Sequence, residues 1–316
     1  MSYEVKSLGK IGPNLQRIFE EEVVGAIEAL EGQANIPRGT HTARKHFKKI
    51  RALLRLGREG IGAAACQSEN ACFRDAGRRL RDLRDAQVLV KALDALRKRF
   101  FNEKHPALLA HARKLLVADE QRCLEHLAGG DTIRDILVTL RAAGARGREW
   151  DLKGFGWKET RRAIRRSYKR ARAAGRKALD DASVANLHEW RKRVKDLWYH
   201  ARLLRKACPG FMKEFAHELD VLSEFLGDDH DLAALRDALW NRREVLKQAR
   251  QLRAFLKMLE IRRNELIRAA FEIGQRLHAD TPAVFARGLD ERREDHRQSR
   301  RKTRKLAPRL ATPARI

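Results

Sequence analysis

Two segments of the 316-residue chain carry the same cationic side chains at the same spacing. Each residue of an α-helix advances about 100° around the axis, so positions 0, 3, 4 and 7 share one helix face. The face opposite is apolar in both segments, which predicts two helices that bury one side and present a cationic stripe on the other. The stripes comprise His41, Arg44, Lys45, Lys48, Arg51 and Arg55 in the first segment, and His188, Arg191, Lys192, Lys195 and Arg202 in the second.

Such stripes suit a polyanionic ligand. Like charges three and four residues apart repel one another, so each stripe destabilises its helix unless a ligand neutralises it. Arginine binds phosphate oxygens through two parallel hydrogen bonds, lysine supplies a mobile charge, and histidine adds a donor that strengthens on protonation. The alternative is a solvated basic face without a ligand, and the near-repetition of the pattern favours binding.

A third helical segment, residues 158–180, places further basic side chains on one face. We expect this face to add to the same cationic field. The equivalent segment at the start of the chain contains Glu20, Glu21 and Glu22 instead, so the second half of the molecule should be the stronger anion binder. The residues expected to contribute are Arg161, Arg165, Tyr168 and Arg172.

The chain contains an internal repeat. The segment Leu80–Leu89 aligns with Leu226–Leu235, which begins 146 residues later. The two histidine segments are 147 residues apart, from His41 to His188. Two matches at nearly one offset indicate a duplicated helical unit, with the halves related by a pseudo-twofold axis.

Helical periodicity extends over almost the whole chain, and no strand-like alternation is present. Helices are expected at about 14–31, 39–58, 69–100, 106–128, 131–145, 158–180, 184–207, 211–226, 229–248 and 250–278, with breaks at glycine or proline, Gly227 among them. The predicted fold is all-α: two pseudosymmetric helical bundles with a basic groove between them.

The composition agrees with this prediction. The 69 Lys+Arg and 42 Asp+Glu give a formal net charge of +27, which favours a polyanionic partner. No apolar run is long enough for a transmembrane helix, and the N-terminus lacks the apolar segment of an export signal, so we expect a cytoplasmic protein that does not contact membranes. Residues 287–316 are basic and poor in large apolar side chains, and we interpret them as a partly disordered tail or a fraying extension of the last helix.

The paired segments resemble those of the CHAD domain (conserved histidine α-helical domain) family. The resemblance rests on Asn186-Leu-His-Glu-Trp-Arg-Lys-Arg-Val-Lys-Asp-Leu-Trp-Tyr199, on His41-Thr-Ala-Arg-Lys, and on the Leu83-Arg84-Asp85 and Leu226 to Asp231 stretches. It implies one domain over 1–286, with repeats at about 12–145 and 157–280. It also implies binding of inorganic polyphosphate in the basic groove and association with polyphosphate granules. Asp196 and His230 depart from the family pattern, which has basic residues there.

Three other functions are alternatives to polyphosphate binding: metal binding, catalysis and nucleic-acid binding. Asp228, Asp229, His230 and Asp231 could ligate a metal, but the other repeat has Arg84 at the position of His230, so we expect no metal or other cofactor. Asp85 and Asp231 are instead expected to accept hydrogen bonds from basic neighbours. No nucleophilic triad, P-loop or dinucleotide-binding pattern is present, which argues against an enzyme. Non-specific nucleic-acid binding is the main alternative, although aromatic residues are only 6%. The sequence leaves the oligomeric state open.

Overall fold

The computed structural model describes residues 3–32, 35–100 and 106–306. Within these ranges the chain forms twelve α-helices and one short 3₁₀ turn, Leu8–Lys10, and contains no strand. The all-α prediction is confirmed. None of the described helices is long and apolar enough to cross a membrane.

The helices of the first half run from the N-terminus to a linker before Trp157. They are α1 (Ile11–Glu31), α2 (Ile36–Ile61), α3 (Ala63–Arg79), α4 (Arg81–Phe100), α5 (Pro106–Gly129) and α6 (Thr132–Arg148). Those of the second half are α7 (Trp157–Asp180), α8 (Val184–Leu203), α9 (Pro209–Trp240), α10 (Arg243–Leu246), α11 (Ala249–Leu277) and α12 (Pro282–Leu306).

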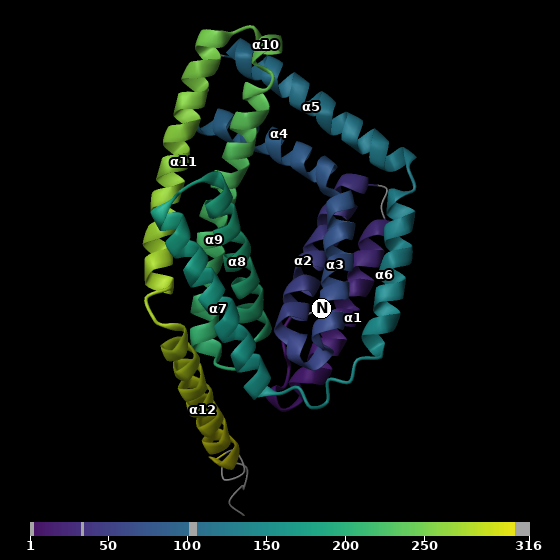
Figure 1. Ribbon diagram of the computed structural model, residues 1–316, viewed down its shortest axis with the longest axis vertical. Coiled ribbons are helices and arrows are strands. Elements are labelled where there is room, and N and C mark those ends of the chain that lie inside the picture. The colour runs from purple at the N-terminus through teal and green to yellow at the C-terminus, as the bar shows by residue number, and fades with distance from the viewer. Residues whose placement is uncertain (1–2, 33–34, 101–105, 307–316) are drawn as a thin grey trace, which may run out of the picture.

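The two halves use corresponding packing pairs. α1 packs on α2 and α6, as α7 packs on α8 and α12; α2 contacts α3, as α8 contacts α9; and α4 packs on α5, as α9 packs on α11. In Figure 1 the helices α1, α2, α3 and α6 lie on one side and α7, α8, α9 and α11 on the other, while α4 reaches across to α9. This arrangement supports the duplication, and superposition of the halves remains a prediction.

One helical break was predicted in the wrong half. The expected single helix over 69–100 is interrupted at Leu80, whereas the expected break at Gly227 does not occur, and α9 is continuous from Pro209 to Trp240. A glycine inside a helix costs about 1 kcal/mol. Burial of the leucines on either side of Gly227, including Leu222, Leu226 and Leu232, outweighs that cost.

A shared core joins the halves. The larger hydrophobic cluster includes Phe19 and Phe47 from the first half together with Trp190 and Leu197 from the second. Within this core His200 of α8 links the two halves, because its Nε2–H donates to the Ala52 carbonyl of α2 over 2.8 Å. Burial lowers the pKa of this imidazole to about 4. A smaller cluster packs α4 and α5 against α9, α10 and α11.

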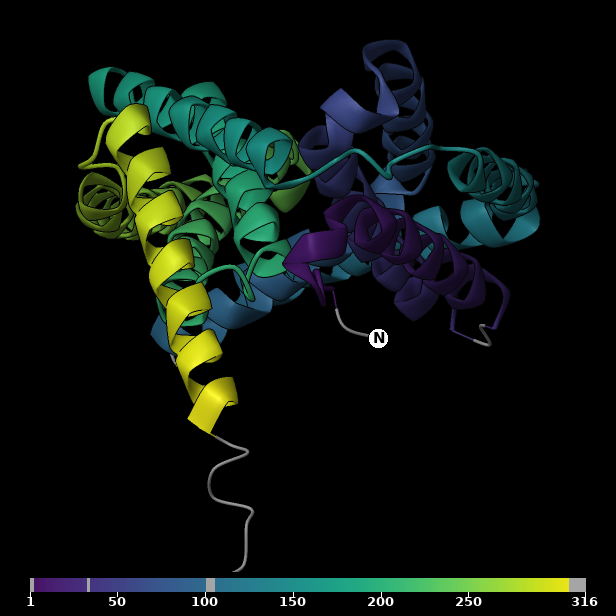
Figure 2. The same ribbon diagram turned by 90° about the horizontal axis from the view of Figure 1, so that it is seen from below.

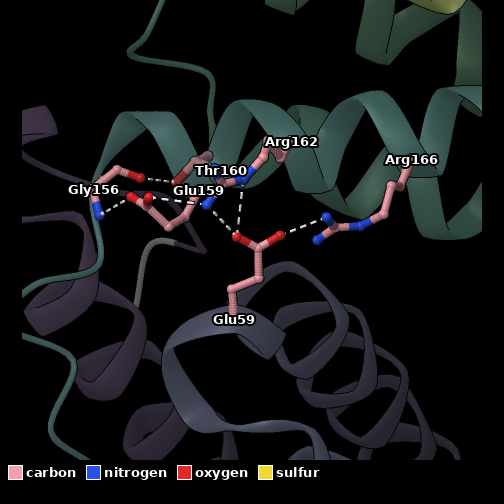
Figure 3. Close-up of polar contacts among 6 residues, drawn as sticks. All are labelled: Glu59, Gly156, Glu159, Thr160, Arg162 and Arg166. Atoms are coloured by element: carbon pink, nitrogen blue, oxygen red, sulfur yellow. Dashed lines mark hydrogen bonds and ion pairs between the residues drawn. The ribbon is translucent and has the colours of Figure 1, made fainter.

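Charged contacts reinforce the seam where α2 meets α7 (Figure 3). Glu59 near the end of α2 accepts hydrogen bonds from Arg162 Nη2 at 2.7 Å and from Arg166 Nη1 at 2.5 Å. The bond from Arg166 is the main reason that the pKa of Glu59 lies below its usual value. At the start of α7 the Gly156 N–H donates to Glu159 Oε2 at 3.1 Å, which caps the helix. Charged contacts between α2 and α7 therefore also join the two halves.

The expected tail is largely a helix. α12 extends to Leu306, so the boundary placed at Arg287 falls inside it, and residues 307–316 lie outside the described part of the chain. Phe285 stacks on Tyr168 with ring centroids 4.1 Å apart, and Leu289 is fully buried. Asp290 then accepts hydrogen bonds from Trp157 Nε1 and Arg161 Nη1, each over 2.7 Å. These contacts seat the first half of α12 on α7, while its far end projects away from both bundles (Figure 2).

Candidate polyanion-binding groove

A cavity of about 560 Å³ lies between α2 and α8, and is called here the α2–α8 groove. Twelve of its sixteen lining residues are arginine or lysine, and one is a carboxylate, Asp196. The lining consists of His41, Arg44, Lys45, Lys48, Lys49, Arg51, Arg55, Arg84, Arg191, Lys192, Arg193, Lys195, Asp196, Trp198, Tyr199 and Arg202.

The two long walls of the groove are the helices predicted from the cationic stripes. Phe47, Ile50 and Leu53 of α2 are buried on the side away from the stripe. Trp190 and Val194 of α8 are buried in the same way. Asn35 and Ser183 cap the two helices by accepting from the N–H groups of Arg38 and Asn186. The apolar faces therefore hold both cationic faces toward one space.

Some of these cations already have acidic partners. Lys49 Nζ lies 2.9 Å from Glu22 Oε1, and Lys195 Nζ lies 3.1 Å from Asp220 Oδ1. Arg55 pairs across the seam with Asp196, and Lys192 pairs with Glu189 on its own helix.

Other basic residues of the groove have no hydrogen-bonded or ion-paired carboxylate within the described chain: His41, Arg44, Lys45, Lys48, Arg51, Arg84, Arg191 and Arg202. Nε of Arg191 and Nη1 of Arg84 are in addition buried and have no hydrogen-bond partner among the described residues. A buried donor without an acceptor is costly, and the cost is greater when the donor is charged. The groove therefore contains donors that an added anion could satisfy.

Burial and the neighbouring positive charges lower the pKa values of two groove residues, Lys48 and His41. Desolvation and the charges of Arg191 and Arg44 lower the pKa of Lys48 to about 8. Desolvation, and after it the charge of Lys45, lowers the pKa of His41 to about 4. At neutral pH His41 is therefore an uncharged imidazole, while most Lys48 side chains are protonated.

Ten of the fifteen predicted site residues line the α2–α8 groove, and five do not. The ten are His41, Arg44, Lys45, Lys48, Arg51, Arg55, Arg191, Lys192, Lys195 and Arg202. The other five are His188 and the four residues predicted on α7, namely Arg161, Arg165, Tyr168 and Arg172.

The α7 prediction is corrected by the packing of that helix. Tyr168 is fully buried, and its hydroxyl lies 3.2 Å from the Leu277 carbonyl and 3.1 Å from that of Asp280. Arg172 Nε donates to the His278 carbonyl at 2.9 Å, and Arg161 pairs with Asp290. The stripe thus faces the end of α11 and the start of α12, while Arg165 is exposed outside the groove.

His188 lies behind the groove wall, against α9. Its ring centroid is 4.4 Å from that of His230, and Nδ1 of each ring is buried without a partner in the described chain. Desolvation, and then the neighbouring His230, lower the pKa of His188 to about 4.

Several groove residues were not predicted. Arg84 comes from α4; its Leu-Arg-Asp motif supports the family resemblance and is the counterpart of the Asp228–Asp231 stretch, but Arg84 itself was not predicted as a ligand-binding residue. Trp198 lies in the groove with Lys195 Nζ 3.9 Å and the Arg202 guanidinium 4.7 Å from its ring centroid. Both cations lie within cation–π distance of the indole. Trp198 could have been predicted from the sequence, because it lies three residues after Lys195 and four before Arg202, on the same helix face.

The acidic residues behave differently from expectation. Asp85 is exposed and lies 3.8 Å from Arg81, and Asp231 is half-buried near Arg191 without a hydrogen bond. The buried ion pair is formed by Asp229, whose Oδ1 accepts from Arg263 Nε at 2.8 Å. The described residues contain no cluster of three or more side chains suited to a metal ion.

The sequence profile of the CHAD domain matches residues 21–240, which is more than two thirds of the chain. The protein belongs to the CHAD domain family. This family is associated with polyphosphate binding.

A solved structure has the same fold. The crystal structure of the CHAD domain from the plant Ricinus communis is 18% identical in sequence, with 92% of this chain and 93% of that chain covered and a TM-score of 0.52. At this identity the match establishes the all-α fold alone. Comparison with curated proteins finds no significant match.

Proposed function

We propose that this CHAD protein binds inorganic polyphosphate in the α2–α8 groove and does not catalyse a reaction there. The observation that carries the proposal is the pair of buried guanidinium nitrogens, in Arg84 and Arg191, that have no acceptor within the described chain. They lie in a cavity with twelve Arg or Lys side chains and a single carboxylate.

A linear polyphosphate fits this chemistry better than a small acid does. Each internal phosphate carries about one negative charge and presents oxygens that accept from arginine and lysine. The cations lie along both walls of the groove, so successive phosphates would meet α2 and α8. Neutralising that charge would also remove the mutual repulsion within each stripe.

Calorimetric titration with polyphosphate of defined length tests the proposal. Arg191→Ala combined with Lys195→Ala removes two cations of the groove. Charge-assisted hydrogen bonds contribute about 1.5–3 kcal/mol each, so the loss of two should lower the affinity by about a hundredfold or more.

The matched control is Arg253→Ala combined with Lys257→Ala. Both residues are exposed on α11, have the same spacing and lie outside the groove, so their loss removes equal charge. Equal weakening by the two double variants would contradict a specific site. A third pair, Arg301→Ala with Lys302→Ala, tests the C-terminal segment, where side chains lie outside the described part of the chain; a larger loss there would assign binding to that segment.

Nucleic acid is the competing ligand, favoured by the presence of Trp198 in the groove. Its ring already has Lys195 and Arg202 within cation–π distance, which argues against its use as a base-stacking platform. Polyphosphate should therefore displace DNA at equal phosphate concentration. The reverse order of affinity would support a nucleic-acid-binding protein.

Association with polyphosphate granules is the proposed cellular consequence. A fluorescent fusion of the wild-type chain should colocalise with granules in a polyphosphate-accumulating bacterium. The Arg191→Ala, Lys195→Ala variant should be dispersed, whereas the α11 control should still colocalise.

A further inference from the structure

A second cavity, of about 300 Å³, lies between α7, α8 and α11. None of its lining residues lines the α2–α8 groove. The cavity therefore has its own chemistry, which the proposed polyphosphate site does not use.

The floor of this cavity is aromatic. Trp190 and Phe271 stack with ring centroids 5.5 Å apart and an interplanar angle of 17°. Gly175 of α7 and Gly274 of α11 flank the indole: a Cβ at Gly274 would lie 2.4 Å from Trp190 Cζ2, and one at Gly175 would lie 2.9 Å from Nε1. Only glycine allows both helices to approach the ring so closely.

Two buried polar atoms at this cavity have no partner within the described chain. They are Nε1 of Trp190 and Nε2 of His278, in side chains that are 1% and 8% exposed. An unsatisfied buried polar group costs about 1–3 kcal/mol, and a bound group that supplied an acceptor to the indole N–H would remove part of that cost.

The rim of the cavity is cationic. Arg176 is exposed and has no ion-paired partner among the described residues, and the hydrogen bond from Arg172 goes to a main-chain carbonyl. Burial lowers the pKa of His278 to about 4, so this imidazole is neutral at physiological pH and the positive charge comes from the two arginines. The lining combines an apolar floor, to which Phe271 contributes a partly exposed ring above the buried Trp190, with a positive edge.

We propose that this cavity binds a small aromatic carboxylate. The ring packs against Phe271, the partly exposed ring of this pair, and the carboxylate lies at the edge formed by Arg172 and Arg176. The volume is at the lower end of the range for small-molecule sites, which limits the ligand to about two fused rings. Polyphosphate has no apolar part and is excluded by the same lining.

The probe for this site is 1-naphthaleneacetate, titrated into the full-length protein by calorimetry with ligand-observed NMR. The wild type should bind one equivalent saturably. Arg176→Ala should weaken binding at least fivefold, whereas Arg250→Ala, an exposed arginine on α11 outside the cavity, should leave it unchanged. Ala279→Trp, at an exposed position of the rim, should fill the cavity and abolish binding.

The melting temperature provides the control for folding and should stay unchanged in each variant, and each variant should also retain the wild-type affinity for polyphosphate. Three results would overturn the proposal: no saturable binding of the probe at millimolar concentration, binding unaffected by both Arg176→Ala and Ala279→Trp, or loss of probe binding in the Arg191→Ala, Lys195→Ala variant. The last would place the probe in the α2–α8 groove. Because the probe titration is independent of polyphosphate, either proposal can fail alone.

Discussion

Polyphosphate binding should be coupled to proton uptake by Lys48. The amine lies among the charges of Arg44 on its own helix, Arg84 on α4, and Arg191 and Lys195 on α8, with Asp231 of α9 as a nearby carboxylate. Desolvation and these cations lower the pKa of Lys48 from 10.5 to about 8 in the ligand-free protein. A bound polyanion favours the protonated amine, so binding should raise that pKa again.

The size of the effect follows from the two pKa values. If polyphosphate restores the pKa of Lys48 to about 10.5, binding takes up about 0.1 proton at pH 7, about 0.5 at pH 8 and about 0.9 at pH 9. Affinity is then highest below pH 8 and decreases as the pH rises through the pKa of the free protein. Between pH 7 and pH 9 the loss should be about tenfold.

Calorimetry at pH 8 in Tris and in HEPES measures this uptake, because the two buffers have different ionisation enthalpies. Lys48→Arg is the matched variant, since arginine stays protonated throughout this range. Protons bound by the polyphosphate itself cancel in the difference between wild type and variant. The reasoning is refuted if the wild type takes up no protons at pH 8, or if Lys48→Arg takes up as many.

Three further outcomes are expected. Gly227→Ala should weaken polyphosphate binding severalfold in a calorimetric titration, because the added Cβ would lie 3.1 Å from Arg191 Nη2. Its melting temperature should be unchanged or raised, because alanine favours the helix more than glycine does. Asp229→Ala should destabilise the protein by about 1–3 kcal/mol in urea unfolding, since it leaves the buried Nε of Arg263 without its acceptor while Nη1 keeps Glu260, and an unchanged stability would contradict that. Stability should fall by about 2–3 kcal/mol between pH 7 and pH 4.5 through His200 alone, because the unfolded imidazole binds a proton near pH 6.5 and the buried one does so only near pH 4; His200→Gln should reduce the pH dependence of urea unfolding by that amount.

The groove walls could be predicted because the information lies within single helices. In α2 the cationic residues and the buried Phe47, Ile50 and Leu53 fall on opposite faces, and helix geometry alone separates them. The same separation holds in α8. The near-repetition of the pattern then indicated that the two faces serve one ligand.

The α7 prediction failed because helix geometry does not say which neighbour covers a face. Tyr168 lies at the centre of the predicted stripe, and an aromatic residue there is as compatible with packing as with binding. In the structure Phe285 of α12 stacks on it. For residues 287–316 the sequence left a disordered tail and a helical extension open, and over 287–306 the structure has a helix. Three buried residues, Phe285, Ala286 and Leu289, are enough to seat this otherwise highly charged helix.

Asp196 illustrates how a single acidic residue affects the groove. It is the only carboxylate in the lining, and it pairs with Arg55 from the opposite half. The pairing removes one free cation from the groove but ties α2 to α8 where the two stripes approach each other. Farther along α2, outside the groove, Glu59 ties the same helix to α7 through Arg162 and Arg166. Within the groove only the Asp196–Arg55 pair joins the two walls among the described residues, and the arginines and lysines without a carboxylate partner remain available for an anion.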